Sequence, residues 1–131
     1  MVKVPNVEML VIQYLKAELT GSGHTVTVAT NVPATRPAEL VKVTATGGEL
    51  RDVVVTEAQL AIECWAASPV LAGDLARDCQ GILTEWPGHQ AGGSFIYDCK
   101  ARVPTSFPDP DTRTPRYIFT VILTLRALVT A

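Results

Sequence analysis

The last third of the chain holds two runs with a two-residue period, separated by a proline-rich segment. In Tyr117 to Leu125 every odd-numbered residue is apolar, and the same holds from Phe95 to Val103. This period is typical of a β-strand with one buried face and does not fit a helix. The intervening residues, 104–114, are too many for a tight hairpin and too restrained by proline to be floppy. The sequence therefore predicts two long strands, with odd-numbered residues toward the core, joined by a stiff loop.

Two other segments have the three- and four-residue spacing of amphipathic helices. The first begins after Asn6, a capping residue, continues through Val7, Leu10 and Val11, and is closed by glycines 21 and 23. The second begins at Ser68-Pro69, a cap followed by proline at the first helical position, and ends before Pro87-Gly88. We therefore expect one helix to begin directly after Asn6 and a second directly after Ser68.

The region between the predicted helices contains further strand patterns. "HTVTVAT" (24–30) predicts a short half-buried strand, and "TNVPATRPAEL" (30–40) predicts an extended loop. "ELVKVTATGGEL" (39–50) predicts a strand that turns at Gly47-Gly48, and its return passes through residues 51–68. There Leu60, Ile62 and Cys64 share a face and Trp65 lies on the other, so we expect the end of this strand to be covered on both sides.

The order helix, strands, helix, strands predicts the α+β class, with a mainly antiparallel sheet and two helices packed on one face. A length of 131 residues, 47% hydrophobic and 18% charged, suits a single small domain spanning residues 1–131. The start, Met1 to Asn6, lacks the apolar run of a secretory signal. No stretch reaches the roughly 18 apolar residues of a spanning helix, so we expect a soluble cytoplasmic protein.

Charge and composition argue against several functions. Eleven basic against 13 acidic residues, a net charge of −2, give no surplus for gripping nucleic acid phosphates. Cys64, Cys79 and Cys99 lack the spacing of a zinc site or disulfide framework, which favours buried free thiols. His24 and His89 have no nucleophile or carboxylate at a recognisable spacing, so we interpret them as solvated loop histidines.

Catalytic, cofactor and metal sites are likewise not expected. Asp109 and Asp111 could cap the loop, present charge to a partner or bind a metal, but the pattern of a calcium-binding loop is absent. Neither common glycine-rich phosphate motif occurs. Trp65 and Trp86 are expected as core or interface anchors, because no basic groove surrounds them to stack bases.

Three isoleucines interrupt the predicted polar faces of the last two long strands: Ile96, Ile118 and Ile122. Two hypotheses account for them. Either the amino-terminal elements cover this face within one chain, or neighbouring subunits pack against it.

Taken together, the linear arrangement resembles the tail terminator proteins of long-tailed (siphovirus-type) bacteriophages. "NVPATRPAELVKVTATGG", "LAIECWAAS" and "FPDPDTRTPRYIFTVILTLR" follow the amino-terminal helix in this order. They are similar to the family patterns "VPxxRP", "WA" and "PDPDTxxPRYxFTVxLxxR". The resemblance covers about Val7 to Arg126, and its last stretch is the most specific. This chain departs from the pattern at Glu57-Ala58, where related chains have Asp then Pro.

The resemblance implies a virion assembly protein, not an enzyme, with no cofactor. Tail terminators form a ring, usually of six subunits, that caps the tail tube, stops its elongation and forms the joint with head-completion proteins. The implied partners are further copies of the chain, the tail-tube protein and a head-completion protein, while DNA passes through the lumen without specific binding. The implied location is the head-proximal end of the tail, with assembly in the host cytoplasm and no membrane contact.

Carried over by position, the resemblance makes two loops, Val32 to Pro37 and Pro104 to Pro115, surfaces for ring neighbours or axial partners. The expected interface residues are Arg36, Pro37, Asp109, Asp111, Arg113, Arg116 and Tyr117. A head-completion or tail-tube protein is the alternative within the same class, and a small enzyme is a remote one. A pocket bringing His89, Asp109 and Asp111 together would favour the enzyme.

Overall fold

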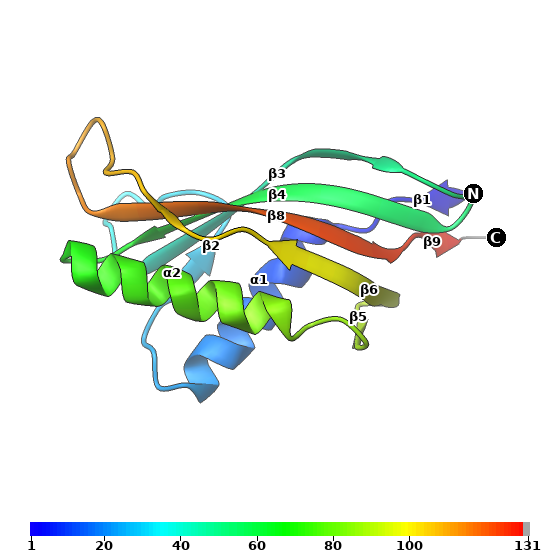
Figure 1. The fold of residues 1–131 in the computed structure, drawn as a ribbon, viewed down its shortest axis with the longest axis horizontal. Coiled ribbons are helices and arrows are strands. Elements are labelled where there is room, and N and C mark those ends of the chain that lie inside the picture. Colours follow the sequence, from blue (N-terminus) through cyan, green and yellow to red (C-terminus); the bar gives the residue numbers. More distant parts are fainter. Residues whose placement is uncertain (130–131) are drawn as a thin grey trace.

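The computed structural model describes residues 1–129 and confirms the predicted α+β class (Figure 1). Two helices and nine strands follow one another along these residues: β1 Val2–Lys3, α1 Val7–Gly21, β2 Thr27–Ala29, β3 Leu40–Leu50, β4 Val55–Trp65, α2 Pro69–Thr84, β5 Gln90–Ala91, β6 Ser94–Ala101, β7 Thr105–Ser106, β8 Arg116–Arg126 and β9 Leu128–Val129. In residues 1–129, neither helix has the length and apolarity needed to cross a membrane.

The strands form a mostly antiparallel sheet in the order β2-β3-β4-β8-β6-β5, with β7 also paired to β8. Only β2 runs parallel to its neighbour, β3. The long central strands β4 and β8 pair along their whole length, from Val55 with Arg126 to Trp65 with Arg116. β1 and β9 form a separate two-stranded ribbon that brings the two ends of the described chain together. Both helices lie on one side of the main sheet (Figure 1).

Both helices begin at the predicted residues. The Asn6 side chain accepts a hydrogen bond from Met9 N at 3.1 Å, and the Ser68 side chain accepts one from Leu71 N at 3.2 Å. These bonds satisfy backbone donors that have no partner inside a helix. Pro69 occupies the first turn of α2, where its missing N–H costs nothing.

The core lies between the helices and the inner face of the sheet. Leu15 and Leu19 of α1, with Leu75 and Leu83 of α2, are at most 1% exposed. The predicted inner face of β8 is confirmed, because Phe119, Val121, Leu123 and Leu125 are all buried. Trp86 is also buried and stacks on Tyr14, with ring centroids 4.5 Å apart.

The prediction of a turn at Gly47-Gly48 is wrong. β3 continues through both glycines to Leu50, and the hairpin closes beyond it, where Arg51 N donates to Val55 O at 2.8 Å. Pairing with β4 shifts between Ala45 and Gly47. The glycines, with φ of 134° and 130°, therefore accommodate a β-bulge within the strand.

The predicted core face of β6 is wrong at its first half. Ile96 is fully buried, whereas Tyr97 is 45% exposed. The pairing of β6 with β8 shifts between Ile96 and Asp98, so one extra residue reverses the alternation there. Cys99 lies beyond the shift and is buried as predicted.

The sheet face opposite the helices, called here the open face, has no helix over it among residues 1–129 (Figure 1). Ile118 is half-buried there and Ile122 is 37% exposed. Ile96 is not on this face, because the bulge turns it into the core. The hypothesis that amino-terminal elements cover this face within one chain is thus not supported for Ile118 and Ile122.

Candidate subunit and partner interface

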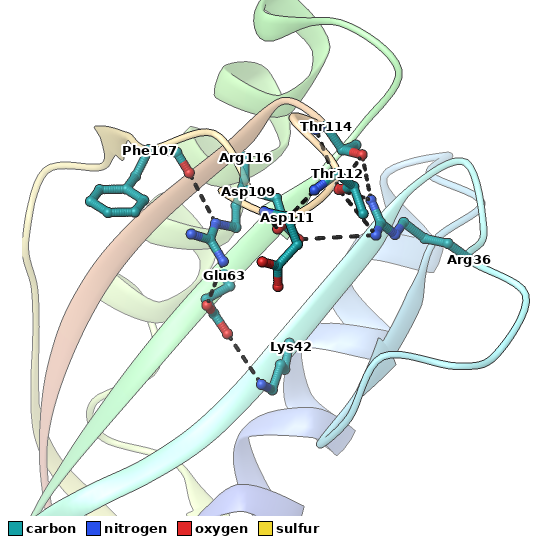
Figure 2. Close-up of polar contacts among 9 residues, drawn as sticks. All are labelled: Arg36, Lys42, Glu63, Phe107, Asp109, Asp111, Thr112, Thr114 and Arg116. Carbon is teal, nitrogen blue, oxygen red and sulfur yellow. Dashed lines mark hydrogen bonds and ion pairs between the residues drawn. The ribbon is translucent and has the colours of Figure 1, made fainter.

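The two predicted loops lie side by side at one end of the open face (Figure 2). We call residues 30–39, between β2 and β3, the Arg36 loop, and residues 104–115, before β8, the proline loop. A hydrogen bond joins the two loops: Arg36 Nη1 donates to Thr114 Oγ1 at 2.6 Å, although these residues are 78 positions apart in sequence. The predicted interface residues of both loops, from Arg36 to Arg113, are thus parts of one surface.

Arg116 anchors the proline loop to the sheet. Its Nε donates to Phe107 O at 2.9 Å, and its Nη1 donates to Glu63 Oε1 at 3.2 Å. The other oxygen of Glu63 lies 3.6 Å from Lys42 Nζ, which extends the row of charges across β8, β4 and β3 (Figure 2). The Arg116 side chain is only 11% exposed, so its hydrogen bonds are made within the protein rather than with solvent.

Two guanidinium groups lie over the ring of Trp65. The Arg116 group is 5.5 Å and the Arg36 group 5.9 Å from the centre of its ring. Trp65 is 2% exposed, which confirms that the end of β4 is covered on both sides. A cation over an indole face is stabilising, so both loops are fixed against the same aromatic residue.

Asp109 organises the tip of the proline loop. Its Oδ1 accepts from Asp111 N at 2.9 Å and Thr112 N at 3.4 Å, and its backbone O accepts from Arg113 N at 2.7 Å. The first of these bonds is the main cause that lowers the Asp109 pKa. Its other oxygen lies 4.0 Å from Arg36 Nη2. Asp109 is thus an internal cap of the loop, as one of the three interpretations predicted.

The outward-facing charges of the proline loop are Asp111 and Arg113. Both are exposed, and Arg113 has a φ of 57°, a conformation that costs a non-glycine residue energy. Pro37 is half-buried in the Arg36 loop and borders a surface hollow of about 400 Å³ with Trp65. Tyr117 is separate from this surface, because its ring packs beneath α2, where a Cβ on Gly73 would lie 3.2 Å from it.

Sequence reasoning missed Glu63, Lys42 and Phe107 as members of this surface. The sequence signal was that Glu63 lies on the same predicted face as Trp65. The pairing of Trp65 with Arg116, which brings Glu63 near that arginine, is seen only in the structure. Opposite charges near each other on adjacent strands attract. Phe107 offered no such signal: it contributes a backbone oxygen, and the centre of its ring lies 5.3 Å from the Arg116 guanidinium, through a loop whose shape no local pattern predicts.

His24 is not a solvated loop histidine, contrary to the prediction. Its Nε2 lies 2.8 Å from Asp78 Oδ2 on α2, and its Nδ1 lies 3.3 Å from Glu39 Oε2. The hydrogen bond with Asp78 is the main cause that raises the His24 pKa. No local pattern indicates this pairing, because 54 residues separate His24 from Asp78.

We expect stability to depend on the charge of His24. A raised folded-state pKa means that the protonated histidine stabilises the fold below its ordinary pKa of about 6.5 and loses this effect as pH rises through the folded-state value. The difference in melting temperature between wild type and His24→Gln should therefore shrink from about pH 5.5 to about pH 8.5. His89→Gln should keep the wild-type dependence, because His24 is intact. A constant difference would contradict this assignment.

The residues named above as candidates for catalysis are dispersed. His89 precedes β5, at the opposite end of the sheet from the proline loop with Asp109 and Asp111 (Figure 1). The three cysteines are free and buried, and burial raises the Cys99 pKa to about 12, which keeps that thiol protonated. Within residues 1–129, no group of three or more His, Cys, Asp or Glu is placed to hold a metal ion.

No family model and no curated protein matches the chain. Among solved structures, the chain is similar to a protein in the virion of a native gene transfer agent (GTA) particle. The TM-score is 0.66 at 13% identity, and the match covers 92% of this chain and 94% of that one. At 13% identity this likeness shows a shared fold and no more.

Proposed function

We propose that this chain is a structural virion protein of the tail terminator type, which forms a ring on the end of a tail tube, stops tube elongation and joins the tube to the head. The observation that carries this proposal is the likeness to a GTA virion protein over nearly the full length of both chains. The sequence resemblance to tail terminators supports the finer role. No catalytic step or cofactor is part of the proposal.

The geometry suits a protein that works through its surfaces. In the described residues 1–129 no helix covers the open face, and the two loops at its end are fixed by Arg116, Arg36 and Trp65 before any partner binds. Loops that are already ordered lose less conformational entropy on docking. We assign the exposed Asp111 and Arg113 to contacts with a neighbouring subunit or an axial partner, together with Pro37.

A ring of identical subunits needs a heterologous interface, in which one patch meets a different patch on the next copy. The partners we propose are other copies, six in the ring, with the tube protein on one side and a head-completion protein on the other. A net charge of −2 is compatible with DNA passing through the lumen unbound.

Electron microscopy and light scattering of the purified protein test this function against its alternative. A terminator should form closed rings, alone or on added tube ends. A tail-tube protein should instead polymerise into long cylinders, which would favour that member of the same class. A protein that remains monomeric and binds no tube end would count against the terminator role.

The two aspartates of the proline loop should respond differently to alanine. Asp111→Ala should leave the melting temperature unchanged and weaken assembly, because its carboxylate is exposed. Asp109→Ala should lower the melting temperature, because the backbone N–H groups of Asp111 and Thr112 lose their acceptor. Thermal melts and sedimentation measure both effects. If Asp111→Ala assembles like wild type, Asp111 is not an interface residue.

A further inference from the structure

The main sheet has two strand edges without a strand partner in residues 1–129, and they lie at opposite margins (Figure 1). β2 covers β3 only as far as Lys42, so the edge from Val43 to Leu50 is unpaired. At the other margin, β5 pairs with β6 only at Ser94 and Phe95. Unpaired edges are templates for pairing with another chain.

A groove of about 520 Å³ lies over this end of the β3–β4 hairpin and reaches the unpaired part of β3. It is lined by residues 4–8, by Ala45 and residues 47–50, and by residues 56–58. Its charged lining residues are Glu8, Glu49 and Glu57, of which Glu57 is ion-paired with Arg51 at 2.9 Å. One backbone group of this edge already has a side-chain partner, because Glu8 Oε2 accepts a hydrogen bond from Ala45 N at 2.7 Å. This edge therefore offers backbone groups next to a groove in which every charged lining residue is a glutamate and the other lining residues are uncharged.

The opposite edge has the complementary character. A groove of about 630 Å³ at β7 is lined by Arg102, Val103, Thr105, Phe107 and residues 118–120, with Arg102 as its one charged member. The exposed Lys100 precedes it on β6. Val103 is 81% and Phe107 54% exposed, which is much apolar surface for an isolated subunit.

We propose that the β3 edge of one subunit binds the β6–β7 edge of the next copy, so that subunits join head to tail. This inference rests on the proposed ring and names its contact. Opposite charges favour the pairing, with Glu49 of one copy meeting Lys100 and Arg102 of the other. Pairing of two β3 edges would instead bring acid against acid. The two patches differ, as a heterologous interface requires.

Charge reversal tests the pairing. Glu49→Lys and Arg102→Glu should each weaken self-association by about tenfold, measured by sedimentation over a range of concentrations. Combining both changes in every subunit should restore most of the affinity, because residue 49 of one copy again meets the opposite charge at residue 102. Lys16→Glu and Glu18→Lys, on the exposed surface of α1, are matched controls and should assemble like wild type.

Thiol cross-linking provides the second readout. A mixture of Glu49→Cys and Arg102→Cys proteins should yield a covalent dimer with a short cross-linker, whereas Glu49→Cys mixed with Lys16→Cys should not. Rings that form without this cross-link and are indifferent to both reversals would overturn the edge pairing while leaving the terminator role intact. A wild-type chain that neither self-associates nor binds tube ends would overturn both.

Discussion

Replacing Arg116 with alanine is expected to destabilise the fold by about 2–3 kcal/mol and to lower the melting temperature by about 10 °C. The substitution removes the hydrogen bond to Phe107 O at 2.9 Å, the ion pair with Glu63 and the cation over Trp65. Glu63, whose side chain is 17% exposed, would keep its ion pair with Lys42 at 3.6 Å. Removing one partner of a largely buried ion pair is costly, because the other charge remains desolvated.

Arg126→Ala is the matched control for this result. Arg126 ends the same strand, is exposed, and lies 5.9 Å from the centre of the Phe95 ring. Its loss should cost about 0.5 kcal/mol. Differential scanning calorimetry of both variants makes the comparison. Equal melting temperatures for the two variants would mean that Arg116 does not hold the proline loop.

Replacing Gly48 with alanine should be at least as damaging, at about 3 kcal/mol. Gly48 has a φ of 130°, which side chains rarely adopt, and an added Cβ would overlap the Glu57 carbonyl oxygen and lie 2.8 Å from Ala58 Cα. Both obstacles belong to the backbone of β4, so relief requires β3 and β4 to separate. Urea denaturation measures the loss.

Gly47→Ala separates strain from overlap. Gly47 has a φ of 134°, yet nothing lies within 4 Å of an added Cβ. Its replacement should cost only the conformational strain, about 1–2 kcal/mol. If Gly48→Ala and Gly47→Ala were equally stable, the close approach of β3 to β4 would not be what requires glycine at position 48.

Much of the fold could be predicted because its signals are local. Asn6 and Ser68 mark helix starts, because each side chain bonds to a backbone N–H three positions later. In β8 the apolar odd-numbered residues indicate the buried face. Local signals fail at bulges. Near Ile96 one extra residue moves the following side chains to the other face of the sheet, and no residue type in the sequence marks the position of this bulge.

The candidate interface was predictable only as two separate loops. Their prolines and charges identified Arg36 and the Asp109 segment, but the bond between Arg36 and Thr114 spans 78 residues. Sequence periodicity also cannot distinguish an arginine that faces a partner from one, like Arg116, that is held inside by Glu63 and Phe107. Tyr117, placed by its odd number with the core residues, packs against α2 accordingly.

The proposal that this chain terminates a tail tube is tested most directly by the lengths of tubes assembled in its presence. Tube protein from the same virion would be polymerised with and without the purified chain and measured by electron microscopy. The account predicts that tubes stop growing and carry one ring at a single end. Incorporation of the chain along the tube wall, or tubes that elongate as they do without it, would contradict it.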